Sequence, residues 1–271
     1  MKKLKICLDA GHYGKYNQSP AVPEYYESDM AWKLHLKLKA QLESCGIDVI
    51  TTRKTQNETL GLTARGKASK GCDLFLSIHS NATGNTVKES VDYPIAFVPI
   101  NGSANSIGEQ LANCVSKIIG TKQKGRSATR KSEKGNWDYY SVITGAVSVG
   151  VPGIILEHSF HTNTTVTKWL LNDDNLNRLA KAEAAVIAKY FNVAQSVKLE
   201  LPVLARGMKN EAVAVLQVLL IHKGYTCGKT GADCKFGDNT HKALTKYQQA
   251  NKLISDGYCR LDSWSKLLGL A

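Results

Sequence analysis

The first two thirds of the chain alternate short apolar runs with longer amphipathic segments, and this alternation constrains the fold most. Apolar runs predict strands over residues 4–10, 47–53, 73–79, 93–99 and 153–160. Helical periodicity predicts helices over residues 28–46, 62–71, 103–119 and 175–190. Strands that alternate with helices form βαβ units, so we expect an α/β fold with a mainly parallel sheet flanked by helices.

The remainder of the chain has a different pattern. Residues 193–202 lose helical periodicity and end at Pro202, which predicts a linker. After it come three amphipathic segments separated by the glycine-rich turn GKTGADCKFGDN. We therefore expect a large domain over residues 1–192 and a small all-α domain over residues 203–271.

Charge and hydropathy narrow the range of partners. The formal net charge is +12, which favours anionic partners such as nucleic acid, anionic membranes or anionic wall polymers. The lysines are spread along the chain without an arginine-rich stripe, a zinc-finger pattern or an RNP-like motif, so we expect no nucleic-acid partner. No apolar run approaches the roughly 20 residues that a membrane helix needs, so we also expect no membrane insertion.

The N-terminus and the cysteines bear on the compartment. The start MKKLKICLDAGHYG is basic but has no apolar core of a signal peptide, so we expect synthesis in the cytoplasm without ordinary export. Most of the seven cysteines should then be reduced. A disulfide between Cys227 and Cys234 is an alternative if the protein ends up outside a cell.

Polar side chains stand where several predicted strands end. His12 follows the first strand, His79 ends DLFLSIH, and Glu157 lies in GIILEHS. The helix that begins near Glu27 starts on the same edge, because a helix that follows a parallel strand begins where that strand ends. Ligands of an open parallel sheet bind beyond these carboxyl ends. Each residue alone has a structural alternative, such as a strand-end histidine or a buried ion-pair partner for Glu157. Together they predict one cluster.

The cluster has the composition of a hydrolytic zinc site. Two histidines and one carboxylate around an open position can hold Zn²⁺ and activate water. A second carboxylate that is not bound to the metal can move the proton. The predicted rim supplies this set.

These residues occur in segments that resemble zinc-dependent N-acetylmuramoyl-L-alanine amidases of the amidase-3 type, over nearly all of residues 4–192. The matching segments are LDAGHYG, YYESDMAWKLHLKLKAQLE, TTRKTQNETLGLTARGKAS, DLFLSIHSNA and VPGIILEHSFHTN. The resemblance implies that His12, Glu27 and His79 are the zinc ligands and that Glu157 is the general base and acid. Glu24 is the alternative to Glu27 as the glutamate ligand, and Glu27 is preferred because it keeps the family's helix register.

Further residues are open between a role in the site and a structural role. Asn81, beside His79, is expected to support the site or the substrate. Arg65 either binds a carboxylate of the stem peptide or forms a structural ion pair. His158 and His161 depart from the family, which usually has a small residue or glycine and then an aliphatic there. They either tune the zinc, contact substrate or serve packing. We expect His35 at the surface or the boundary of its helix.

The C-terminal region has a resemblance of its own. Its segments LARGMKNEAVAVLQVLLIHKGY, FGDNTHKALTKYQQANKL and DGYCRLDSWSKLL are similar to the peptidoglycan-binding type-1 module. We expect Gln217 and Gln248 to be packing or turn-capping groups rather than sugar ligands. Both halves of the chain then point to peptidoglycan as the partner.

The sequence therefore predicts a zinc amidase with a wall-binding domain, which cleaves the bond between N-acetylmuramic acid and L-alanine. Its alternatives are a zinc peptidase cutting within the stem peptide and a non-catalytic wall-binding protein. Without a signal peptide, the enzyme is expected to reach the wall after release. A phage endolysin released through a holin lesion is favoured over an autolysin acting on mother-cell lysis.

Overall fold

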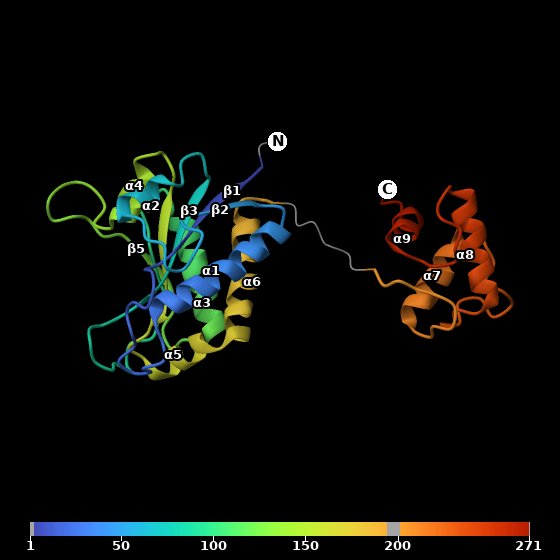
Figure 1. Ribbon diagram of the computed structural model, residues 1–271, viewed down its shortest axis with the longest axis horizontal. Helices are drawn as coiled ribbons and strands as arrows, with labels where there is room; N and C mark the ends of the chain where they lie inside the picture. The colour runs from blue at the N-terminus through green and yellow to red at the C-terminus, as the bar shows by residue number, and fades with distance from the viewer. Residues whose placement is uncertain (1–2, 194–200, 271) are drawn as a thin grey trace. The chain divides into compact units, whose positions relative to one another are not determined.

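The computed structural model describes residues 3–193 and 201–270 (Figure 1). Contacts divide the chain into two compact units, Met1–Ser196 and Val197–Ala271. The predicted linker, residues 193–202, falls mainly on residues 194–200, which lie outside the described residues.

The larger unit contains strands and helices in alternation over most of its length. In chain order its described elements are β1 (Lys5–Ala10), α1 (Glu27–Ser44), β2 (Asp48–Thr51), α2 (Leu62–Lys67), β3 (Leu74–Asn81), β4 (Ile95–Phe97), α3 (Asn105–Ile119), β5 (Arg126–Ala128), α4 (Ser141–Val147), β6 (Gly153–Phe160), α5 (Thr164–Leu171) and α6 (Asp173–Tyr190). The expected α/β class is confirmed. The sequence prediction missed β5, α4 and α5, which are three to eight residues long.

The strands form one sheet in the order β2-β1-β3-β6-β4-β5. β1 is parallel to β2 and β3, and β3 is parallel to β6. β4 runs antiparallel to β6, and β5 follows β4 in parallel. The sheet is therefore mainly parallel, as expected, and β1, β3 and β6 end at one edge. We call it the carboxyl edge.

Helices cover both faces of the sheet, because side chains of the buried strands alternate between two cores. Along β3, Leu74, Leu76 and Ile78 belong to the core beneath α1, α3 and α6, whereas Phe75 belongs to a smaller core with α4. Figure 1 shows α2 and α4 on one side of the sheet and α1, α3 and α6 on the other. Ser77 and His79 share the face of Phe75.

Helix α1 begins at Glu27, and one prediction about a residue of this helix, His35, is wrong. Its buried residues recur every three or four positions, which holds the helix against the sheet, and it ends before Gly46 in the left-handed conformation. His35 is buried on this face with 2% exposure, rather than lying at the surface or the boundary. Its ring packs against Trp32, and burial lowers its pKa to about 4, so it stays neutral inside the core.

The smaller unit consists of α7 (Glu211–His222), α8 (Asp238–Ala250) and α9 (Leu261–Leu268) around its own core. Gln217 donates to Asp233 Oδ1, the Lys235 carbonyl and Thr240 Oγ1, each at 2.9–3.0 Å. Gln248 donates to the Tyr258 carbonyl and accepts from the Gly257 N–H. Both glutamines therefore hold turns together, as the sequence predicted.

Two further observations concern the described residues as a whole. None of the helices in residues 3–193 and 201–270 combines the length and apolar character required to cross a bilayer. Cys227 and Cys234 are not bonded to each other in the part of the chain that the structure describes.

Candidate active site

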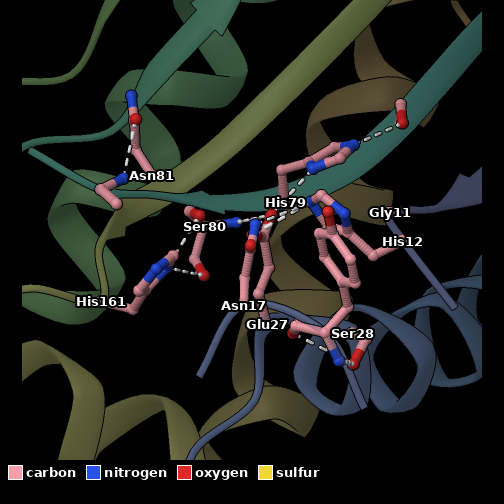
Figure 2. A network of polar contacts seen from close by, with 12 residues as sticks. Gly11, His12, Asn17, Glu27, Ser28, His79, Ser80, Asn81 and His161 are labelled. Atoms are coloured by element: carbon pink, nitrogen blue, oxygen red, sulfur yellow. Dashed lines mark hydrogen bonds and ion pairs between the residues drawn. The ribbon is translucent and has the colours of Figure 1, made fainter. Parts of the chain in front are cut away.

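Three neighbouring strands and the helix after the first of them bring the predicted residues together. His79 and Glu157 lie side by side on β3 and β6, in register. His12 stands two residues beyond the end of β1, and Glu27 is the first residue of α1. Figure 2 shows the side chains of His12, Glu27 and His79 pointing toward one another.

The close approach depends on Gly11. A Cβ atom at this position would lie 2.5 Å from Cε1 of His79, so any larger residue would displace the ring. The Gly11 N–H donates to the Ile78 carbonyl at 2.9 Å, which ties the end of β1 to β3. The next residue, His12, adopts φ 56°, and this turns the chain back toward the site.

Glu27 lies at the centre of the cluster. Its Oε1 is 2.8 Å from Nδ1 of His79, and its Oε2 is 3.2 Å from Nε2 of His12. The three candidate ligand atoms lie within 4.8 Å of one another, which makes His12, Glu27 and His79 a group able to hold a metal ion. Glu24 is exposed and stands outside this group.

Glu27 is kept charged although it is buried. Its Oε2 accepts from Nδ2 of Asn17 at 2.7 Å, and its Oε1 accepts from the Ser80 N–H at 3.1 Å. Burial raises the pKa of Glu27, but the hydrogen bonds and charges of His12 and His79 outweigh burial and leave the pKa lowered. A carboxylate held in this way is suited to coordinate a cation.

Glu157 faces the same cleft in a different state. Its Oε2 is buried and has no hydrogen-bond partner among the described residues. Burial, with a smaller contribution from the charge of Glu27, raises the pKa of Glu157 well above its usual value, against the opposing effect of His158. The two carboxylates therefore differ. Glu27 accepts hydrogen bonds and has a lowered pKa, whereas Glu157 has an oxygen without a partner among the described residues and a raised pKa.

These groups line a cleft of about 700 Å³. Half-exposed tyrosines just after His12, and residues at the start of α4, extend the wall of the cleft. The further lining residues include Tyr13, Tyr16, Leu60, Arg65, Asn81, Tyr140 and His161. The ring of Tyr16 stacks on His12 with a centroid distance of 4.9 Å. The cleft is large enough for a ligand that extends beyond the two histidines.

Asn81 and Arg65 both line the cleft, but their side chains are engaged differently. The Oδ1 of Asn81 accepts from the Ala82 N–H, and its Nδ2 has no partner among the residues described. Arg65 is buried, donates from Nε to the Leu60 carbonyl at 3.0 Å, and places Nη1 3.6 Å from Oδ2 of Asp9.

His158 lies on the opposite face of the sheet from Glu157 and is fully buried. Its Nδ1 donates to the His79 carbonyl at 2.9 Å, and its Nε2 is 3.0 Å from Oε1 of Glu183 on α6. Burial lowers the pKa of His158, but the Glu183 carboxylate and the hydrogen bonds outweigh burial and leave it raised. His158 therefore links α6 to the backbone of β3 behind the cluster.

His161 lines the cleft itself and is held by the neighbouring strand. Its Nδ1 lies 3.0 Å from both the carbonyl and the hydroxyl of Ser80 (Figure 2). That hydroxyl is 2.7 Å from the Tyr25 hydroxyl. Burial lowers the pKa of His161, which keeps the ring neutral.

Sequence reasoning missed four polar residues around the cluster: Asp9, Asn17, Ser77 and Glu183. Asp9 alone carried a signal, since it is a carboxylate inside the apolar run LKICLDA, where an unpaired charge would be costly. The others are recognisable only from the contacts that the fold creates.

The fold and the site define an enzyme of the α/β class with a His/Glu/His group that could hold a metal ion, beside a second carboxylate with an oxygen that has no hydrogen-bond partner among the described residues. Residues 6–189 match the Amidase_3 family, described as N-acetylmuramoyl-L-alanine amidase, and the chain belongs to this family. Residues 209–263 match the PG_binding_1 family, described as a putative peptidoglycan binding domain. Both resemblances expected from the sequence are confirmed, and so is the class of enzyme.

Relatives and solved structures agree with this family. The chain is 25% identical over 197 residues to N-acetylmuramoyl-L-alanine amidase CwlM of Bacillus licheniformis, covering 71% of each chain. An N-acetylmuramoyl-L-alanine amidase structure from Clostridium difficile 630 superposes with a TM-score of 0.60 at 18% identity, covering 71% of this chain and 98% of that one. Cwp6 from Clostridium difficile gives 0.58 at 23% identity, over 69% of this chain and 29% of the other. The structural likeness concerns the fold.

Proposed function

We propose that this peptidoglycan amidase works with a zinc ion held by His12, Glu27 and His79, and that Glu157 transfers the proton. The amide that it cleaves joins the lactyl group of N-acetylmuramic acid to L-alanine of the stem peptide. The observation that carries the proposal is the convergence of three candidate ligand atoms within 4.8 Å, beside a carboxylate oxygen of Glu157 that has no hydrogen-bond partner in the part of the chain described.

The donor set fits zinc. Two imidazole nitrogens and one carboxylate oxygen are a frequent ligand set of catalytic zinc, which keeps a further position open. Oε1 of Glu27 and Nδ1 of His79 are 2.8 Å apart, and such a contact between two electron-pair donors is favourable only with a cation or a proton between them. When bound, zinc supplies the Lewis acidity for attack of water on the amide carbonyl.

The chain's own residues supply the remaining chemistry. Glu157 has an unpartnered carboxylate oxygen and a raised pKa, which suits a group that takes a proton from water and returns it to the departing amine. Hydrogen bonds from Asn17 and Ser80 keep Glu27 oriented toward the two histidines. Because the two carboxylates have different partners, one can bind the ion while the other moves protons.

For the substrate we propose a contact with Asn81, whose Nδ2 is unengaged in the described residues and lines the cleft. Arg65 stays a substrate candidate because it also lines the cleft. Its contacts with Asp9 and the Leu60 carbonyl favour the alternative of a structural ion pair.

The reaction and the zinc ligands are tested on purified peptidoglycan. Wild-type protein should release new L-alanine amino groups without new reducing sugars. Chelation should abolish this release and zinc should restore it. His79→Ala should lower the bound zinc, and Glu157→Gln should keep zinc but lose activity by about 10²-fold or more.

Other outcomes identify the alternatives. New amines other than that of L-alanine would indicate a zinc peptidase acting within the stem peptide, and no product at all would indicate a non-catalytic wall-binding protein. Full activity of Glu157→Gln would disprove its role as the proton carrier.

We further propose a lytic role, in which the amidase unit and the wall-binding unit act together on the cell wall as in an endolysin. The two families matched in one chain support this proposal. Release through a phage holin lesion, or on mother-cell lysis, stays a prediction. Lysis predicts that purified cell walls lose turbidity as L-alanine amino groups appear.

A further inference from the structure

A buried line of polar groups leads away from His79 on the side opposite Glu27. Nε2 of His79 is 3.0 Å from Oγ of Ser77, and that hydroxyl is 2.7 Å from Oδ2 of Asp9. Asp9 and Ser77 are register partners on β1 and β3, and both are fully buried. The adjacent strands therefore build this line directly, without a loop.

The direction of each hydrogen bond follows from the chemistry of Asp9. A carboxylate only accepts hydrogen bonds, and this one also accepts from Oγ1 of Thr52 at 2.5 Å and lies 3.6 Å from Nη1 of Arg65. The single hydroxyl proton of Ser77 must therefore point to Asp9. The oxygen of Ser77 is left to accept, and Nε2 of His79 must be the donor.

This arrangement determines which nitrogen of His79 is free. With the proton on Nε2, the neutral imidazole carries its lone pair on Nδ1. Nδ1 is the nitrogen that faces Glu27, at 2.8 Å from its Oε1, and Glu27 is a member of the candidate metal-binding group. The buried line thus selects the tautomer in which His79 can bind a cation on the correct side.

We propose that Asp9 and Ser77 are positioning residues that fix the tautomer and the ring orientation of His79, and so present Nδ1 to the metal ion. The inference rests on the proposed metal site. Groups that hold the second nitrogen of a metal-binding histidine commonly change metal affinity by about 10- to 100-fold. No comparable buried line reaches His12 in the part of the chain described, where its Nε2 meets only Glu27 and Asn17.

Asp9→Asn is the sharpest test because it changes proton positions with little change in shape. The Asn amide can donate to the Ser77 oxygen, which turns the Ser77 proton toward Nε2 of His79 and moves the histidine proton to Nδ1. Ser77→Ala removes the acceptor and serves as a second variant if Asp9→Asn does not fold. Asp138→Asn is the matched control, because Asp138 is also buried but accepts from the Ile100 N–H, away from the cluster.

Two measurements on full-length protein decide the inference. Competition with a chromophoric chelator gives zinc affinity, which should fall about 10- to 100-fold in Asp9→Asn and Ser77→Ala and stay within about twofold in Asp138→Asn. Nitrogen-15 NMR of the zinc-loaded protein should show a slowly exchanging His79 proton on Nε2 in the wild type and a faster-exchanging one in Asp9→Asn.

Unchanged zinc affinity in both variants, or a His79 Nε2 proton that exchanges equally fast in the zinc-loaded wild type and Asp9→Asn, would overturn the inference. These results differ from a failure of the proposed function, in which the wild-type protein itself would bind no zinc.

Discussion

The proposed proton-transfer role of Glu157 requires a buried carboxylate that lowers the stability of the folded protein when it is ionised. It is the buried carboxylate whose Oε2 lacks a partner in the described chain, and burial keeps its pKa raised. A raised pKa means that the native state binds the proton more tightly than the unfolded chain does. Its stabilising contribution is complete below the unfolded pKa of about 4.3 and is lost as the pH rises through the folded value.

Glu157→Gln should therefore stabilise the metal-free protein at neutral and alkaline pH. Removing a buried charge without a partner should add about 1 kcal/mol or more, which raises Tm by roughly 2–4 °C for a unit of this size. Thermal unfolding at several pH values measures the difference, which should vanish in acid, where both side chains are neutral. A variant less stable than the wild type at alkaline pH would contradict this account.

Single residues also show how far the sequence alone can be taken. His12, His79 and Glu157 could be placed on one edge because parallel strands all end there, and Glu27 because the next helix starts there. The hydrogen-bonded line from Asp9 through Ser77 could not be predicted from the sequence, since it depends on the register of β1 against β3. The prediction for His35 was wrong because a polar residue in an amphipathic helix is assigned to the exposed face by its polarity, whereas its burial depends on the side chains packed around it.

At the scale of elements, an ion pair within an apolar core joins α6 to the sheet. His158 of β6 and Glu183 of α6 are both fully buried and 3.0 Å apart. Because the pKa of His158 is raised, this pair contributes its full stability below the unfolded pKa of about 6.5 and loses it as the pH rises through the folded value.

Glu183→Gln should destabilise the protein by about 3 kcal/mol, because it leaves a buried imidazolium without its partner. The loss should be largest in mildly acidic buffer and shrink at alkaline pH. Urea unfolding at two pH values measures it. The double variant His158→Leu/Glu183→Leu is the control and should lose less, since no polar group is left unpaired. Equal losses in the two proteins would show that packing, rather than the ion pair, holds α6.

Short elements escaped prediction for a physical reason. β5 has three residues and α4 has seven, too few for a period of two or 3.6 to stand out from the sequence. Their positions are set by tertiary contacts: Gly66 of α2 and Gly145 of α4 approach so closely that a Cβ on either would meet the other helix's backbone. The long elements α1, α3 and α6 repeat their apolar face over several turns and were predicted.

At the scale of the whole molecule, the amidase family match and the peptidoglycan-binding family match lie in units with separate hydrophobic cores. The larger unit contains all the residues of the cluster, and the smaller unit contains the peptidoglycan-binding family match. A tethered binding unit raises the effective concentration of an enzyme at a polymer without changing its active site.

Deleting residues 201–271 should therefore lower activity on insoluble peptidoglycan by about tenfold or more and leave activity on a small soluble muramoyl-peptide within about twofold. Initial rates on both substrates measure the two effects, and co-sedimentation with cell walls reports binding. Equal losses on the two substrates would show that the smaller unit supports the catalytic unit rather than its attachment.

The reversed direction of β4 has a consequence for how this enzyme can diversify. β3 ends at the carboxyl edge and β4 begins there, beside Glu157, so the connection over residues 82–94 starts and finishes on the same edge. A connection of this kind does not cross the sheet, and residues can be added to it without altering any strand pairing. New substrate preferences can therefore evolve beside an unchanged catalytic centre.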